Sequence, residues 1–127
     1  MIENVRSAEL TQRILGCAFR VHSALGPGLL ESAYRTCLLQ ELDSGGLRAK
    51  SEVPVQLHYR DAMLDCAYRA DIIVEEAVLL ELKCVKRLKS IHTAQALTYM
   101  KLAKMPVGLI LNFNTLSLRD GIRRLVL

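Results

Sequence analysis

The stretch from Asp71 to Lys83 decides the fold, and it reads Asp-Ile-Ile-Val-Glu-Glu-Ala-Val-Leu-Leu-Glu-Leu-Lys. Two apolar runs flank a charged turn, and a turn centred on Glu76 predicts that they pair as antiparallel strands. The Cβ atoms of Asp71 and Glu81 would then lie about 5 Å apart across the ladder. Strand alternation places Lys83 on the same face as Glu81. The predicted pairs are Val74 with Val78, Ile73 with Leu79, Ile72 with Leu80, and Asp71 with Glu81.

Two carboxylates at this separation repel each other unless a positive charge lies between them. Hard oxygen donors on adjacent strands suit Mg²⁺ or Mn²⁺. Such a metal lowers the pKa of bound water and stabilises charge on a phosphoryl oxygen, while Lys83 would orient the water or offset the charge. The alternative is a structural salt bridge between Lys83 and one carboxylate. The apolar surroundings weaken that alternative, because an unmatched buried carboxylate is costly.

Size and composition are those of a globular protein. A chain of 127 residues supports a single domain covering residues 1–127, and 51% hydrophobic with 24% charged residues excludes a disordered chain. No apolar run approaches the roughly 18 residues that span a bilayer, and the N-terminus lacks an apolar signal-peptide stretch. The net charge of +4 fits a polyanionic partner but does not demand one.

The cysteines are widely spaced, with no Cys-x-x-Cys pair and no clustered histidines. We therefore predict buried packing thiols in a reduced, cytoplasmic protein rather than a disulfide framework or a zinc site. They are Cys17, Cys37, Cys66 and Cys84.

Apolar periodicity and turn residues predict seven elements along the chain. Three strands joined by hairpins and a fourth reached through a helix give an α/β sandwich with a mixed four-stranded sheet, in the order α-α-β-β-β-α-β. A short segment at 121–127 is too apolar for a free tail and hints at an interface. The elements are helices at 7–24, 29–42 and 91–103, and strands at 52–59, 71–74, 78–83 and 107–113.

Two helices supply further polar candidates. Glu31 lies near the start of the second helix, where it either favours the helix dipole or provides a third carboxylate facing the metal. Gln95 and Tyr99 are four residues apart, so they project from one face of the third helix. They would hold a phosphate or a metal-bound water; the alternative is a pair that is exposed to solvent or lies at the edge of the core.

Basic candidates flank the acidic site. Lys86, Arg87 and Lys89 follow Lys83 closely, where backbone phosphates would pass, although a solvated basic loop is equally consistent with them. His22 either contacts phosphate or caps the C-terminus of the first helix, and the cap is the interpretation we favour.

Taken together, these residues resemble the GxxExxY family, a branch of the PD-(D/E)xK nuclease superfamily. The resemblance runs from about Ile14 to Phe113. Its landmarks are Val21-His22, Gly26-Pro-Gly28, Glu31, Tyr34, Tyr68-Arg69-Ala70-Asp71, Glu81-Leu82-Lys83, Gln95, Tyr99 and Gly108 to Phe113. Ala70 stands where the superfamily's name places a proline, a minor departure.

The resemblance implies a restriction-endonuclease-like core of helix, three strands, helix and strand. It also implies that Asp71 and Glu81 bind Mg²⁺, that Glu31 completes the metal site and that Lys83 assists the water. Gln95 and Tyr99 resemble the Gln-x-x-x-Tyr element of recombination-type exonucleases.

We therefore expect a metal-dependent nuclease that hydrolyses nucleic acid, DNA being favoured, and that gains specificity from a homodimer or a partner protein. Two alternatives stay open. One is a catalytically silent nucleic-acid-binding or interaction module, in which Asp71→Ala leaves binding intact. The other is a structural component of an assembly, in which Lys83 and Glu81 pair and no metal binds.

Overall fold

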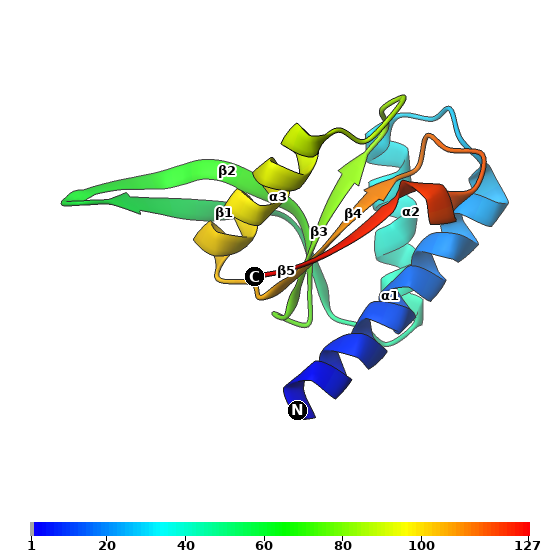
Figure 1. The fold of residues 1–127 in the computed structure, drawn as a ribbon. Helices are drawn as coiled ribbons and strands as arrows, with labels where there is room; N and C mark the ends of the chain where they lie inside the picture. The colour runs from blue at the N-terminus through cyan, green and yellow to red at the C-terminus, as the bar shows by residue number, and fades with distance from the viewer. Residues whose placement is uncertain (1) are drawn as a thin grey trace.

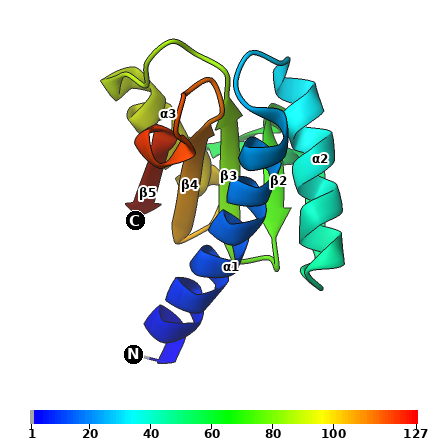
Figure 2. The same ribbon diagram turned by 90° about the vertical axis from the view of Figure 1, so that its right-hand side faces the viewer.

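The computed structural model describes residues 2–127, apart from the side chains of residues 2–6, 66 and 67. A twisted sheet lies between two helices on one face and one helix on the other (Figures 1 and 2). This confirms the predicted α/β fold with a mixed sheet. The elements are α1 (Ile2–Leu25), α2 (Glu31–Ser44), β1 (Ala49–Tyr59), β2 (Ala62–Val74), β3 (Val78–Lys83), α3 (Ser90–Ala103), β4 (Val107–Asn112), the 3₁₀ helix η1 (Leu118–Gly121) and β5 (Ile122–Val126).

The central hairpin has the predicted register for its first three pairs, from Val74–Val78 to Ile72–Leu80. Its turn is closed by the Ala77 N–H, which donates to the Val74 carbonyl at 3.0 Å. The regular β2–β3 ladder ends at Ile72–Leu80, so the expected fourth pair of Asp71 with Glu81 is not part of it.

The sheet has five strands in the order β1-β2-β3-β4-β5, one more than predicted. Strands β3 and β4 are parallel and connected through α3, whereas the other neighbours are antiparallel. The additional strand is β5, which pairs with β4. Its Ile-Arg-Arg-Leu-Val sequence has no clean alternation, so its strand identity depends on the free edge of β4.

Helices α1 and α2 cover one face of the sheet, and α3 covers the other (Figure 2). Coverage on both faces explains why β3 and β4 are apolar at nearly every position. The α1/α2 core contains Ile14, Val21, Tyr34, Leu38, Ile72, Leu80, Leu82, Leu109, Leu111 and Phe113, among others. The α3 core contains Val55, Ala70, Ile73, Leu79, Met100 and Met105.

The helix boundaries differ slightly from the predicted ones. Helix α1 begins earlier than residue 7, and α2 begins at Glu31. Helix α3 begins at Ser90, one residue earlier than predicted, and at its start the imidazole of His92 accepts the Lys89 backbone N–H at 2.9 Å.

The cysteines that the structure describes are consistent with packing roles. Cys17 is buried, and Cys37 and Cys84 are half-buried; all three are free thiols. The side chain of Cys66 lies outside the described residues. No helix in the described part of the chain is long and apolar enough to cross a membrane.

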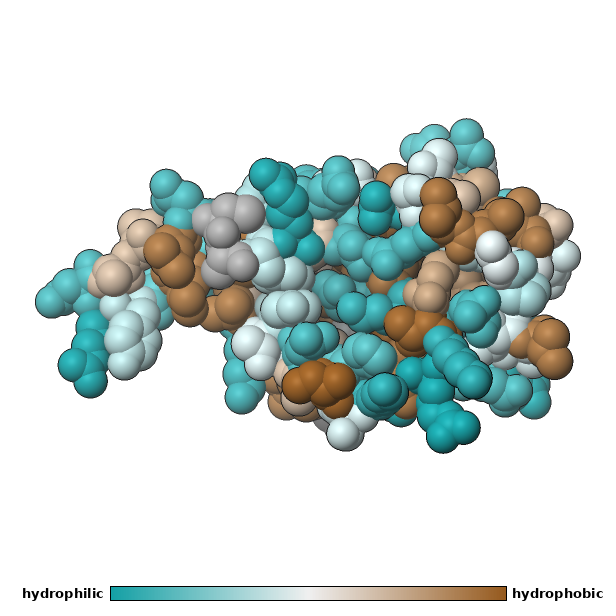
Figure 3. Space-filling view, turned by 90° about the horizontal axis from the view of Figure 1, so that it is seen from above, coloured by the Kyte–Doolittle hydropathy of each residue, from teal (hydrophilic) through white to brown (hydrophobic). Residues whose placement is uncertain are grey.

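The β1–β2 hairpin projects beyond the sandwich (Figure 1). Glu52, at φ 50°, interrupts β1 where the hairpin twists away, and the register shifts between Val55 and Leu57. Near its end the hairpin exposes Tyr59 and Met63, and apolar side chains gather on this arm at the left of Figure 3. Hydrophilic side chains predominate over the middle of the same view, which looks down on the end where β3 finishes.

Candidate functional site

Asp71 lies where the side-chain alternation of β2 breaks. Ile72 packs in the α1/α2 core, whereas both Ile73 and Ala70 pack in the α3 core. At this irregular position Oδ2 of Asp71 accepts the backbone N–H of Leu82 at 2.8 Å. The carboxylate therefore reaches across to β3 beyond the last pair of the ladder.

Glu81 is the most buried carboxyl group of the candidate site, at 6% exposure. The hydroxyl of Tyr68 donates to its Oε1 at 3.3 Å. Burial and the charge of Asp71 raise the pKa of Glu81 to about 8, against the opposing charge of Lys83. Burial also raises the pKa of Asp71. Two carboxyl groups in this situation resist being ionised together.

Glu31 is held near this pair by the loop that precedes α2. The Tyr34 hydroxyl donates to the Gly26 carbonyl at 2.6 Å and accepts the Leu29 N–H at 3.1 Å. Since the Tyr34 ring is buried and stacked on Phe113, the loop and the start of α2 are fixed against the core. Burial, and next the charge of Asp71, raise the pKa of Glu31, so the charges of Glu31 and Asp71 interact.

Arg35 lies between these acids, one helical turn after Glu31. Its Nη1 is 3.7 Å from a carboxylate oxygen of Glu31 and 3.7 Å from Oδ1 of Asp71. Its Nη2 is 3.5 Å from Glu52 on β1. Arg35 was not among the residues predicted from the sequence, although its i+4 spacing from Glu31 was a usable signal.

Lys83 ends β3 two residues after Glu81 and is half-buried. Its charge pulls down the pKa values of Glu31, Asp71 and Glu81, which places it in the same electrostatic cluster. No ion pair within 4.0 Å joins Lys83 to a carboxylate among the described side chains. Its ammonium group is thus near the acids without being tied to one of them.

Gln95 and Tyr99, the predicted pair on α3, have different surroundings in the structure. The Tyr99 ring stacks on Tyr68 with centroids 3.6 Å apart, which connects α3 to the residue that bonds Glu81. Gln95 is half-buried one turn earlier and has no hydrogen-bonding partner among the described side chains. Tyr68 is a landmark of the family resemblance that was assigned no role, although its position three residues before Asp71 placed it near the site.

The basic candidates occupy two different places. The backbone of Lys86, Arg87 and Lys89 follows β3 directly, and with His92 they line a shallow pocket at the start of α3. The guanidinium of Arg123 on β5 anchors this loop by donating to the Leu88 and Lys89 carbonyls at 2.9 and 3.0 Å. The basic loop is therefore held at the end of β3 where Lys83 lies.

His22 is buried in the α1/α2 layer instead. Its Nε2 lies 2.8 Å from the Thr115 carbonyl, and its ring contacts Phe113 with centroids 6.3 Å apart. This bond attaches α1 to the loop after β4. Nothing in these contacts brings His22 to the three carboxylates.

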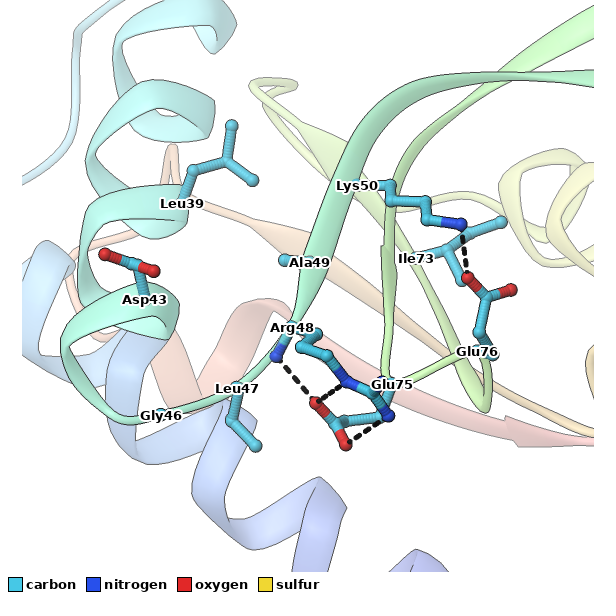
Figure 4. A pocket seen from close by; sticks show the side chains of 10 residues that line it. All are labelled: Leu39, Asp43, Gly46, Leu47, Arg48, Ala49, Lys50, Ile73, Glu75 and Glu76. Carbon is cyan, nitrogen blue, oxygen red and sulfur yellow. Dashed lines mark hydrogen bonds and ion pairs between the residues drawn. The ribbon is translucent and has the colours of Figure 1, made fainter.

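A larger pocket lies elsewhere, at the β2–β3 turn (Figure 4). Four of its charged side chains form pairs: Arg48 bonds Glu75, and Lys50 lies 2.6 Å from Glu76. The fifth, Asp43, is exposed on α2. Glu81 lies toward the other end of β3, so pocket size does not locate the candidate site here.

A buried and a half-buried carboxylate on adjacent strands, with an acidic helix start and a lysine at the strand end, form the arrangement to compare with known proteins. A family model described as the PD-(D/E)XK nuclease superfamily matches residues 8–125. The chain belongs to this superfamily. No curated protein and no solved structure matches it.

Nucleases of the PD-(D/E)XK superfamily generally use divalent metals, and the acidic pair of this member fits such an ion. Asp71 and Glu81 supply hard oxygen donors from adjacent strands, and Mg²⁺ is commonly held by one or two carboxylates with water completing its shell. The charge of Asp71 raises the pKa of Glu81, and a cation near both carboxylates would offset that repulsion. The described carboxylates do not converge as a ready three-ligand group, so Glu31 is at most an outer contributor in this conformation.

Proposed function

We propose that this protein is a Mg²⁺- or Mn²⁺-dependent phosphodiesterase acting on nucleic acid, with DNA the favoured substrate. The observation that carries the proposal is the buried Glu81 and the half-buried Asp71, whose charge acts on it, with the ammonium of Lys83 two residues away. A structural role would need only one carboxylate and one lysine. A second carboxylate withdrawn from water costs stability unless it serves a ligand.

Within the proposed GxxExxY branch of the superfamily, the motif is Gly28, Glu31 and Tyr34. Tyr34 supports this assignment because its hydroxyl fixes the loop that carries the glycine. Each motif residue then has its own structural role. The glycine turns the chain, the tyrosine anchors the turn, and Glu31 starts α2 beside Asp71.

In the proposed reaction Asp71 and Glu81 hold the metal and Glu31 contributes from α2. When bound, the metal supplies an acidified water and neutralises charge on a phosphate oxygen. Lys83 donates a hydrogen bond that orients the attacking water and stabilises negative charge developing on the phosphorane oxygens. Because no carboxylate holds this ammonium within 4.0 Å among the described side chains, Lys83 is available for that role.

Substrate positioning is proposed for the groups around the acids. Gln95 and Tyr99 would hold the backbone from α3, and Lys86, Arg87 and Lys89 would contact neighbouring phosphates along the loop after β3. His22 joins this set only as an indirect contributor, because its imidazole already bonds the Thr115 carbonyl. A second copy or a partner protein would extend the small surface of a 127-residue chain.

The second candidate is a catalytically silent nucleic-acid-binding or protein-interaction module. The observation in its favour is that the described carboxylates do not converge as a three-ligand group. A binding module keeps its affinity for nucleic acid without metal, whereas the proposed enzyme requires the metal for cleavage.

The test is calorimetric titration of Mn²⁺ into the wild type, Asp71→Ala and the control Asp43→Ala, whose carboxylate is exposed on α2. Single- and double-stranded DNA and RNA are then incubated with each protein and Mg²⁺. We expect metal binding and cleavage by the wild type and the control, and neither by Asp71→Ala. Lys83→Met should bind metal and fail to cleave. Nucleic-acid binding without metal affinity in the wild type would favour the silent module.

A further inference from the structure

The guanidinium of Arg35 lies among carboxylates from three different elements. Its nitrogens are 3.7 Å from Glu31 on α2, 3.7 Å from Asp71 on β2 and 3.5 Å from Glu52 on β1. The Arg35 side chain is only 21% exposed, so water does not screen these charges as it would on an open surface. Arg35 is thus a cation placed inside the acidic cluster.

The distances show that this cation is loosely held. Tight N–H···O hydrogen bonds are about 2.7 to 3.2 Å long, and all three contacts of Arg35 are longer. Arg123 shows what a structural arginine looks like in the same protein, since it donates three bonds of 2.6 to 3.0 Å. Arg35 supplies charge to the cluster without a fixed hydrogen-bonding geometry, so a competing cation can displace it.

The cluster needs such a charge. Glu31 and Asp71 each have a pKa raised by burial, and the charge of Arg35 acts against that rise in both. A guanidinium cannot lose its proton in a protein, so it offsets the carboxylates at every working pH. No three His, Cys, Asp or Glu side chains in the described part of the chain converge as a metal site, and the guanidinium lies beside two of the candidates.

We propose that Arg35 is the resident counter-cation of this cluster and competes with a divalent metal ion for Asp71 and Glu31. Metal entry then moves the guanidinium away from these two carboxylates. The inference rests on the proposed function to the extent that it requires a metal to bind at Asp71.

The first test compares Mn²⁺ affinity of the wild type, Arg35→Gln and Arg35→Lys by calorimetry at about pH 8.5, well above the ordinary carboxyl range of about 4. Repulsion between a unit charge and a divalent ion about 6 Å away corresponds to roughly tenfold in affinity even at water-like screening. Arg35→Gln should therefore bind Mn²⁺ about tenfold more tightly, and Arg35→Lys close to wild type. Arg20→Gln, which breaks the ion pair between Arg20 on α1 and Glu41 on α2, is the matched control and should change nothing.

A second measurement uses the unmodified side chain. In ¹⁵N-labelled wild type, the Nε–H signal of Arg35 is assigned by its loss in Arg35→Lys. It should shift when Mg²⁺ is added, while the signal of Arg20 stays in place. Because this signal is measured in the wild type, it tests the proposal even if Arg35→Gln folds poorly.

The outcomes separate the two claims. Wild-type metal binding that is lost in Asp71→Ala but unchanged or weaker in a folded Arg35→Gln overturns the counter-cation role and leaves the proposed function intact. An Arg35 signal that does not move as metal binds does the same. Absence of Mn²⁺ binding in every variant, Arg35→Gln included, overturns both.

Discussion

The backbone N–H of Leu82 donates a 2.8 Å hydrogen bond to Oδ2 of Asp71, just beyond the point where the β2–β3 ladder ends. The Asp71 carboxylate here accepts an N–H that a backbone carbonyl would accept in a regular ladder. The acid that we assign to metal binding is therefore also a structural acceptor, and its two roles can be separated by substitution.

We expect Asp71→Asn and Asp71→Ala to differ in stability and agree in metal binding. The asparagine carbonyl can still accept the Leu82 N–H, and removing a buried charge offsets other losses. Alanine leaves that N–H without its acceptor, at a cost of about 1–3 kcal/mol. Both lack the carboxylate, so calorimetry should detect no Mn²⁺ binding in either. Urea unfolding measures the difference in stability, and equal stabilities would contradict the acceptor role.

Stability should fall as pH rises toward 8 because of Glu81. Its pKa is raised to about 8 in the fold, chiefly by burial, against an ordinary value near 4.3. The folded state then holds a proton that the unfolded state has released between these values, so the free energy of unfolding decreases with pH across that window, by a few kcal/mol at most. Urea titrations at a series of pH values should show this slope in wild type.

Glu81→Gln removes the titrating group and should flatten the pH dependence. A slope in Glu81→Gln as steep as that of wild type would assign the effect to other groups. Saturating Mg²⁺ should restore wild-type stability at the alkaline end, because metal favours the ionised pair.

Tyr68→Phe and Tyr99→Phe form a matched pair. Both keep the stacked rings, but only Tyr68 donates to Glu81. We expect Tyr68→Phe to lose about 1 kcal/mol of stability and to change Mn²⁺ affinity by several-fold, because a carboxylate oxygen loses its donor. Tyr99→Phe should leave metal affinity unchanged and slow cleavage. Identical metal affinities in both variants would show that the Tyr68 hydroxyl does not position Glu81.

The basic loop after β3 predicts a salt-dependent affinity. Replacing Lys86, Arg87 and Lys89 together by alanine should weaken nucleic-acid binding and lower the slope of log K against log salt by about 0.7–0.9 per lost phosphate contact. Fluorescence anisotropy with labelled oligonucleotides at several salt concentrations measures this slope. Lys101 and Lys104, exposed at the far end of α3, are the control, and an equal loss in both variants would indicate a nonspecific charge effect.

Two glycines, Gly108 on β4 and Gly121 at the end of η1, predict unequal stability losses. A Cβ at Gly121 would overlap the Asn112 carbonyl, which is backbone and cannot move aside. A Cβ at Gly108 would lie 2.6 Å from the flexible Met100 side chain. Gly121→Ala should therefore cost about 3 kcal/mol or more and Gly108→Ala about 1 kcal/mol, measured by chemical unfolding. A larger stability loss in Gly108→Ala than in Gly121→Ala would mean that the backbone around η1 and β5 adjusts more easily than the packing between α3 and β4.

The register of the central hairpin and the helix or strand identity of the main elements could be predicted from local sequence signals. Turn residues and apolar periodicity are local signals, and Val74, Val78 and their neighbours have no alternative pairing that keeps both faces of the sheet covered. The family motif likewise marked Glu31, Asp71, Glu81 and Lys83 as candidates, because their order along the chain is itself the pattern.

How those candidates meet depends on contacts between distant parts of the chain. The break in alternation at Asp71, the strand identity of β5 and the place of His22 in the core depend on long-range packing that no local periodicity encodes. Arg35 and Tyr68 enter the site because α2 and the projecting hairpin bring them beside the acids. The physical reason is that charge and hydrogen bonds act through space, so a cluster drawn from separate elements exists only once the chain has folded around it.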